Sequence, residues 1–184
     1  MLEDKQRWNK KYQENPMPEH PSPLLEKYLD HAHVGQALDV ACGTGRNTHF
    51  LAEKGFLVDA VDISDYALSQ VKNNSIITKI EADLDTYNIT PNKYDLIVNT
   101  NFLNRRLVSQ MKDALKSGGT LVFETFIVAH GDFQMPTTNL DYLLRKNELL
   151  HNFIGLDIIY YEEKIDTNLK GEKIKLASLV AKKA

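Results

Sequence analysis

The stretch Leu38-Asp-Val-Ala-Cys-Gly-Thr-Gly-Arg46 decides the fold of this 184-residue chain. The apolar run from Ala37 to Val40 is short and continuous, which is typical of a parallel strand buried on both faces. Gly43 and Gly45 follow it directly, and two glycines so close together predict a tight loop. The stretch therefore predicts a buried strand that ends in a glycine loop.

A helix and a second strand are predicted after the glycine loop. Residues 46–53 predict the helix, and the run Leu57-Val-Asp-Ala-Val61 predicts the next strand, with Asp62 at its carboxyl end. Together these elements form a βαβ nucleotide-binding unit, in which an acid at the end of the second strand accepts hydrogen bonds from a ribose diol. Taken alone, Asp62 also fits a cap of the helix that follows it.

The spacing of the glycines distinguishes two kinds of nucleotide. A dinucleotide site has the pattern G-x-G-x-x-G, whose third glycine allows close packing of the helix. Thr48 stands at that third position, and the chain instead reads Asp39-x-Ala41-x-Gly43-x-Gly45. This pattern resembles motif I of class I S-adenosylmethionine-dependent methyltransferases, whose ligand has no phosphate. That family often has glycine where Ala41 stands, and alanine costs little there unless the backbone needs a positive φ.

The remaining periodicity predicts one α/β domain. Ser64 is expected to cap a helix over 65–72, and Gly118-Gly119 to stop a helix over 107–115. A loop is expected over 127–140. Further strands are expected at 76–80, 94–98, 120–126, 157–165 and 173–182, and a further helix at 141–153. The fold class is a single doubly wound Rossmann-like domain with a seven-stranded, mostly parallel sheet, in which a C-terminal hairpin inserts one antiparallel strand. This layout resembles that of class I methyltransferases.

The first 30 residues differ from the rest of the chain. The segment from Glu3 to Gln13 is polar, but Trp8 and Tyr12 are four residues apart and would share one helix face. Prolines at 16, 18, 21 and 23 then block helix formation until about Leu24, where a short helix to residue 28 is expected. We expect residues 1–30 to form a helical lid with a proline-rich connector, and residues 31–184 to form the methyltransferase domain. Permanent docking of the helix on the core is the alternative.

Composition excludes several classes of protein. The net charge of −3 gives no global attraction to nucleic acid, so a nucleic-acid partner is disfavoured. The single cysteine, Cys42, forbids an internal disulfide and fits a reducing cytoplasm. No apolar run approaches the roughly 20 residues that a membrane span needs. We expect a cytoplasmic monomer or homodimer without a membrane partner.

Ligands of open α/β sheets bind at the carboxyl ends of the strands, where the strand order reverses. By the resemblance, Asp62 accepts the ribose hydroxyls, Asp83 accepts the adenine amino group, and Asp39 lies near the methionine amino group. Asn99 and Thr100, placed just past the fourth strand, would lie beside the methionine part and the transferable methyl. Taken alone, Asp83 also fits a surface turn. The cofactor S-adenosyl-L-methionine is thus expected to be held by Trp8, Tyr12, Asp39, Ala41, Cys42, Gly43, Thr44, Gly45, Arg46, Asn47, Asp62, Ile63, Ala82, Asp83, Leu84, Asn99 and Thr100.

A narrower resemblance covers nearly the whole chain. Cys42-Gly-Thr-Gly-Arg-Asn47 with Leu51-Ala52 resembles the small tellurite-resistance-type methyltransferases, as do Glu148-Leu149, Tyr161-Glu162 and the final run over 174–182. The chain departs from that family at Lys164-Ile-Asp-Thr167, where the family carries a His-Arg pair. The resemblance therefore implies methyl transfer to a small molecule, but it does not assign the acceptor.

Candidate acceptor-side residues come from two loops. Asn101, Arg105 and His130 are the candidates for catalysis, because residues 101–106 and 130–139 follow strand ends on the methyl side of the cofactor. Arg105 begins a helix, where a cation opposes the helix dipole, so either an acid partner in the fold or an anionic acceptor is expected. His130 can act as a base near neutral pH, or it is an exposed loop histidine. Cys42 is expected to be a small buried side chain rather than a nucleophile.

The predicted function is methyl transfer from S-adenosylmethionine to a small acceptor. Because a sulfonium is already a strong electrophile, the protein mainly has to align the acceptor, the methyl group and the leaving sulfur. No metal is expected, since the six histidines lack ligand spacing with cysteine or acids. Two alternatives remain: a nicotinamide-dependent reductase, and a non-catalytic S-adenosylmethionine-binding regulator.

Overall fold

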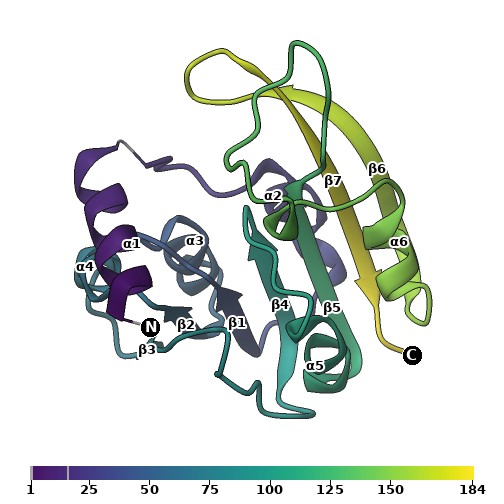
Figure 1. The fold of residues 1–184 in the computed structure, drawn as a ribbon. Coiled ribbons are helices and arrows are strands. Elements are labelled where there is room, and N and C mark those ends of the chain that lie inside the picture. The colour runs from purple at the N-terminus through teal and green to yellow at the C-terminus, as the bar shows by residue number, and fades with distance from the viewer. Residues whose placement is uncertain (1, 16) are drawn as a thin grey trace.

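A computed structural model describes residues 2–15 and 17–184, so Met1 and Pro16, one of the four connector prolines, lie outside the described residues. A single seven-stranded sheet runs through the molecule in the order β3-β2-β1-β4-β5-β7-β6 (Figure 1). The strands are β1 (Gln36–Val40), β2 (Leu57–Asp62), β3 (Ile77–Glu81), β4 (Tyr94–Thr100), β5 (Leu115–Phe126), β6 (Asp157–Thr167) and β7 (Lys173–Lys182). The α-helices are α1 (Leu2–Glu14), α2 (Pro23–Tyr28), α3 (Arg46–Glu53), α4 (Asp65–Gln70), α5 (Leu107–Ala114) and α6 (Glu148–Phe153), and the 3₁₀ helices are η1 (Leu29–His31) and η2 (Leu140–Tyr142).

The sheet is doubly wound, as the sequence predicts. Strands β1 to β5 pair in parallel, and β7 pairs antiparallel with both β5 and β6. The strand order runs outward from β1 through β2 to β3 on one side and from β4 to β5 on the other. The point of reversal lies between β1 and β4, where ligands of such sheets bind.

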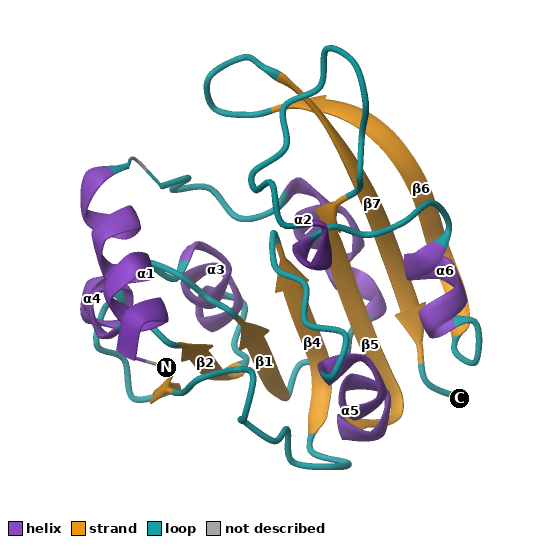
Figure 2. Cartoon of the chain, viewed as in Figure 1, coloured by secondary structure: helices purple, strands orange, loops and turns teal. Residues whose placement is uncertain are grey.

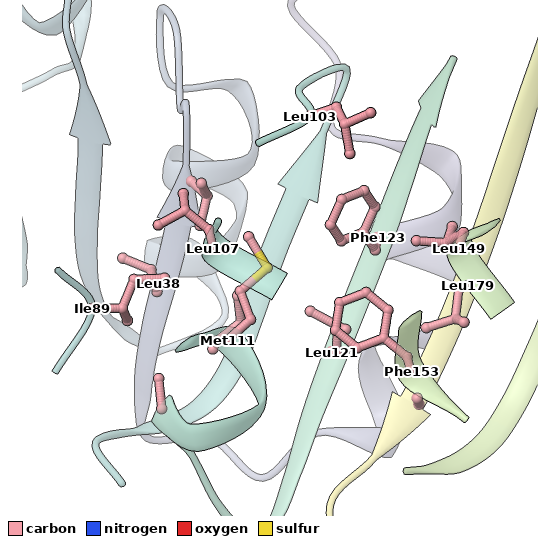
Figure 3. Packing of buried hydrophobic residues seen from close by; sticks show 14 of the residues in the cluster. Leu38, Ile89, Leu103, Leu107, Met111, Leu121, Phe123, Leu149, Phe153 and Leu179 are labelled. Atoms are coloured by element: carbon pink, nitrogen blue, oxygen red, sulfur yellow. The ribbon is translucent and has the colours of Figure 1, made fainter. Parts of the chain in front are cut away.

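Helices cover both faces of the sheet (Figure 2). On one face, Met111 of α5 and Phe153 of α6 pack in a cluster that includes Leu38 and Phe123 from the sheet (Figure 3). On the other face, α2 and α3 bury Leu25 and Leu51 against the sheet. The boundary that the sequence predicts between a lid and a domain, at residues 30 and 31, stays a prediction. Helix α2, on the lid side of that boundary, is part of the core.

Several predicted elements differ from the structure in their extent, two of them substantially. Gly118-Gly119 does not stop a helix: α5 ends at Ala114, and both glycines lie inside the long strand β5. A Cβ at residue 119 would lie 2.9 Å from the carbonyl oxygen of Tyr94, so the glycine permits close approach to β4.

The helix predicted over 141–153 exists only as η2 and α6. Between them, Leu144 donates its N–H to the carbonyl of Phe126, and Val128 donates to Leu144, so this segment extends the sheet instead. Pairing with a distant strand end thus replaces local helix formation. Helix α4 ends two residues before the predicted Lys72, and β4 runs two residues past the predicted Val98. Asn99 and Thr100 are therefore the last residues of a strand.

No helix within residues 2–15 and 17–184 is long and apolar enough to cross a membrane.

Candidate functional site

A cavity of about 500 Å³ lies at the carboxyl ends of β1, β2 and β4, on both sides of the reversal point. Its walls come from α1, the glycine loop after β1, the segment after β3 and the segment after β4. Phe126, Pro136, Thr137 and Tyr142 complete it from the direction of β5 and the long loop that follows. The volume falls within the roughly 300–1,000 Å³ of small-molecule sites.

The glycine loop is fastened to the end of β2 through Asp62. Gly43, at φ 56°, donates its N–H to Asp62 Oδ2 over 2.8 Å, and Ser64 donates its N–H to Asp62 Oδ1 over 2.9 Å. The Asp62 carboxyl is only 3% exposed, and burial raises its pKa, while the two backbone N–H donors oppose that shift. The helix cap belongs to Ser64, whose Oγ accepts from the Ala67 N–H. Asp62 therefore orders the loop rather than capping α4.

Ala41 lies in the left-handed region, at φ 52°. Alanine is therefore costly at this position, because its Cβ is crowded at positive φ. Asn101, at the end of β4, also has a positive φ of 58°. Both residues line the cavity, so this site holds two residues with backbone strain.

Beneath the loop, Asp39 is almost completely buried and does not line the cavity. Thr48 Oγ1 donates to Asp39 Oδ2 over 2.6 Å. Burial raises the pKa of Asp39 to about 7, against the lowering effects of the Thr48 hydroxyl and of the Arg46 charge. Arg46 does line the cavity, and within the described part of the chain its guanidinium makes no ion pair or hydrogen bond.

Helix α1 covers the cavity with one of its faces. The residues that line it recur every three or four positions along the helix and are Asp4, Arg7, Trp8, Lys11 and Tyr12. The Trp8 and Tyr12 rings are 5.8 Å apart, and Lys11 Nζ lies 4.3 Å above the Trp8 ring. The Tyr12 hydroxyl is 3.4 Å from Asp62 Oδ2, and a Cβ on residue 43 would lie 3.1 Å from that hydroxyl. Burial, followed by the Asp62 charge, raises the pKa of Tyr12.

Polar contacts hold α1 in place. Lys5 Nζ lies 2.9 Å from Asp65 Oδ2 and 2.6 Å from Glu81 Oε1. Asn9 donates to Asp65 Oδ1 over 2.7 Å and accepts from Ser64 Oγ over 2.6 Å. No described residue of α1 is buried. We refer to these contacts of Lys5 and Asn9 as the α1 latch.

Most of the predicted cofactor residues meet in the cavity, although their individual contacts with a ligand stay predictions. Gly45 and Asn99 do not line it: Gly45 begins α3 at φ 88°, and Asn99 is buried and donates to the carbonyl of Phe102. Ala82 lies in a smaller hollow of about 230 Å³ beside α1. Those that line the cavity are Trp8, Tyr12, Ala41, Cys42, Gly43, Thr44, Arg46, Asn47, Asp62, Ile63, Asp83, Leu84 and Thr100.

The structure places the three predicted catalytic residues in different surroundings. Asn101 lines the cavity, whereas His130 is exposed and lies outside its walls. Arg105 has the acid partner that its position at a helix start suggested. Its Nε and Nη2 lie 2.6 and 3.0 Å from the two carboxylate oxygens of Glu148, and Nη2 also donates to the carbonyl of Leu143. Arg105 thus ties the end of β4 to the segment before α6.

Sequence reasoning missed several cavity residues. Three of them, on α1, carry a signal that was available: Asp4, Arg7 and Lys11 share the helix face of Trp8 and Tyr12. The others come together only through the fold and have no shared pattern in the sequence. They are Met17, Pro18, Asp85, Phe126 and Tyr142, whereas Phe102, Leu103, Pro136 and Thr137 lie within the two segments, 101–106 and 130–139, that the sequence assigned to the acceptor side.

The strand order, with a cavity at its reversal point, defines the fold of the class I S-adenosylmethionine-dependent methyltransferases. A crystal structure of such a methyltransferase from Mesorhizobium loti superposes with a TM-score of 0.71 at 19% identity, over 88% of this chain and 96% of that chain. The crystal structure of TehB from Haemophilus influenzae has a TM-score of 0.74 at 23% identity, over 98% of this chain and 67% of that chain.

The family model described as "Tellurite resistance protein TehB" matches residues 1–180, and this chain belongs to the TehB family. A curated relative from Haemophilus influenzae, named a probable S-adenosyl-L-methionine-dependent methyltransferase TehB, is 28% identical over 167 residues. That match covers 80% of this chain and 57% of the relative. The chain therefore spans little more than half the length of this curated relative.

Proposed function

We propose that this chain binds S-adenosylmethionine in the cavity and catalyses transfer of its methyl group to a small-molecule acceptor. The observation that carries the proposal is the buried Asp62 carboxylate, hydrogen-bonded to Gly43 at the mouth of a cavity in a TehB-family fold. The names of the relatives support the same activity. Thr48 stands in place of the third glycine of the dinucleotide pattern, which allows close packing of the helix, and this disfavours a nicotinamide dinucleotide.

The cavity residues fit the chemistry of this cofactor. Two acids, Asp62 and Asp83, match a ribose diol and an adenine amino group, and the unpaired Arg46 guanidinium matches a carboxylate. Asp39 lies below the loop on the side where an ammonium group would lie, and such a cation would favour its ionised form against the burial that raises its pKa to about 7. The cavity therefore offers complementary groups to each polar part of S-adenosylmethionine.

The cofactor supplies an electrophilic methyl group, and the remaining work falls to the chain's own residues. The strained loop that contains Ala41 and the end of β4 at Asn101 hold their backbone groups in fixed positions. Aromatic side chains of Trp8, Phe102 and Phe126 exclude water from the same space. Alignment and exclusion of water are the main requirements of this displacement.

Helix α1 serves as the lid in this proposal. Its latch is polar and accessible to solvent, and its aromatic face lies over Gly43 and Asp62. The Tyr12 hydroxyl donates to an oxygen of the Asp62 carboxylate that a ribose hydroxyl would use. Entry of the ligand therefore requires α1 to shift. The acceptor would approach from Asn101 and Thr137, on the side where Phe102 and Phe126 also line the cavity.

The same proposal includes a cytoplasmic monomer or homodimer that needs neither metal nor nucleic acid. Size-exclusion chromatography with light scattering distinguishes the two oligomeric states. Binding and turnover in the presence of a metal chelator address the expectation of metal-free activity.

Calorimetric titration with S-adenosylhomocysteine, S-adenosylmethionine and NADH tests the cofactor. We expect binding of the first two, and binding of NADH alone would contradict the proposal. Incubation of the chain and isotopically labelled methyl donor with cell extract then tests turnover. Formation of S-adenosylhomocysteine together with a labelled small molecule supports methyl transfer, whereas tight binding without turnover would indicate a regulator.

A further inference from the structure

Asn47 lies in the first turn of α3, and its side-chain amide joins three segments of the chain. The residue is 3% exposed. Its Oδ1 accepts from the backbone N–H of Ser22 over 2.9 Å, across 25 residues of sequence, and its Nδ2 donates to Thr100 Oγ1 over 3.1 Å, across 53 residues. Because both ends of the amide are engaged, Asn47 fixes the spacing between the segments that it joins.

Each of these segments carries part of the cavity wall. Ser22 ends the connector that leads from α1, in which Met17 and Pro18 line the cavity. Thr100 ends β4 and precedes Asn101, on the side where the acceptor is expected. Asn47 thus touches both the attachment of the lid and the acceptor side of the site.

The connector has a fixed end and a free end. Ser22 is 1% exposed and stands between Pro21 and Pro23, whose rings restrict the backbone on either side. At the other end, none of the described residues of α1 is buried, and the contacts that hold it include the α1 latch of Lys5 and Asn9 and the Tyr12–Asp62 contact. A buried hydrogen bond is worth more than an exposed ion pair. When the latch opens, rotation is therefore expected about the Ser22–Asn47 contact.

We infer that Asn47 is a positioning residue, which anchors the hinge of the α1 lid to the acceptor-side end of β4. The inference rests on the proposed function, since it assumes a ligand under the lid. In this role, the Asn47 side chain holds the connector and the end of β4 in position. The cavity-facing atoms of the loop contact the ligand.

Two neighbouring residues supply matched controls. The Ser22 Oγ is buried and has no hydrogen-bond partner among the described residues, so Ser22→Ala removes a hydroxyl at the hinge but keeps the N–H that Asn47 accepts. Thr100→Val removes the oxygen that accepts from Asn47 at nearly constant shape, and Thr100→Ser restores that oxygen.

The experiment measures affinity for S-adenosylhomocysteine by calorimetry and the access of acrylamide to Trp8 by fluorescence quenching, on the full chain, with circular dichroism as a check of folding. We expect Asn47→Ala to weaken affinity about tenfold and to leave Trp8 accessible at saturating ligand. Thr100→Val should weaken affinity about threefold, and the double variant should be no weaker than Asn47→Ala, because coupled residues are not additive. Ser22→Ala should match the parent chain, and Thr100→Ser should recover the part of the Thr100→Val loss that comes from the hydrogen bond to Asn47.

Full protection of Trp8 in ligand-saturated Asn47→Ala would overturn the inference, as would independent, additive effects of Asn47→Ala and Thr100→Val. If Asn47→Ala does not fold, a difference between Thr100→Val and Thr100→Ser in Trp8 protection supports the inference, and identical behaviour overturns it. If the parent chain binds no S-adenosylhomocysteine, the proposed function fails. The hinge is then decided by Trp8 quenching without ligand, which Asn47→Ala must increase.

Discussion

The two walls of the cavity are built in opposite ways. The wall formed by the glycine loop and the end of β2 is buried, and its carboxylate receives backbone N–H groups from both Gly43 and Ser64. The wall formed by α1 (Figure 1) has no buried residue among those described, and solvent reaches Lys5, Asp65 and Glu81 of its latch. One wall is therefore ordered before a ligand arrives, and the other can move at small cost.

This difference follows from what each wall is required to do. Buried, hydrogen-bonded backbone opens only with a large part of the fold, whereas exposed ion pairs open locally. A preorganised wall reduces the ordering cost of binding. A movable wall admits the ligand and then excludes water. The predictions below begin with the buried wall, where the largest effects are expected.

Asp62→Ala should have the largest effect. It removes the acceptor of the Gly43 and Ser64 N–H groups as well as the proposed ribose contact, so both stability and binding should fall. We expect affinity for S-adenosylmethionine to drop at least about tenfold, equivalent to roughly 1.4 kcal/mol, and the free energy of unfolding to drop by about 1–3 kcal/mol. Calorimetry and urea unfolding measure the two. Unchanged affinity in a folded variant would contradict the ribose assignment.

The pH dependence of stability should report the buried Asp39. Burial raises its pKa in the folded state to about 7, compared with about 3.9 in an unfolded chain. The folded state therefore binds the proton more tightly, so this contribution to stability is complete below about pH 4 and is lost as the pH rises to about 7. Between pH 5 and pH 8, the parent chain should lose more thermal stability than Asp39→Asn, which keeps an acceptor for Thr48. Parallel curves for the two proteins would contradict the shift.

Ala41→Gly should stabilise the buried wall. Relief of a left-handed alanine gains roughly 1–2 kcal/mol, and the greater unfolded-state entropy of glycine costs about 0.4–1 kcal/mol, so a net gain of about 0–1.6 kcal/mol is expected. The matched control is Ala52→Gly, in the helical conformation of α3, which should instead lose about 1 kcal/mol. Urea unfolding compares the two, and a loss of stability in both would show that the Ala41 Cβ packs favourably.

Opening the α1 latch should have the smallest effect on stability but a clear effect on the movable wall. Lys5→Met with Asn9→Ala removes the contacts to Asp65, Glu81 and Ser64. The thermal midpoint should change little, while acrylamide quenching of Trp8 should rise in the absence of ligand. Lys10→Met, which loses only an exposed 3.9 Å pair with Glu14, is the control. Equal quenching in both variants would mean that α1 is docked permanently by its aromatic face.

The same contrast separates what could be predicted from what could not. Residues 36–62 were predicted nearly to the residue, because an apolar strand, a glycine loop and a helix start are each encoded by neighbouring residues. The segment over 141–147 was not predicted correctly, because the backbone of Leu144 pairs with Ile127, which directly follows β5 and lies 17 residues earlier in the chain. Helical spacing alone contained no sign of that partner.

The sequence by itself determined that the sheet is doubly wound, that a glycine loop follows β1, and that an acid ends β2. These features depend on local conformational preferences and on the rule by which consecutive parallel strands are connected. Only the tertiary structure decided the positive φ of Ala41, the pairing of Arg105 with Glu148, the α1 latch, and the joining of Ser22 and Thr100 through Asn47. Each of these depends on distances between groups far apart in the chain. Such distances are set when the sheet packs against its helices, and no local pattern encodes them.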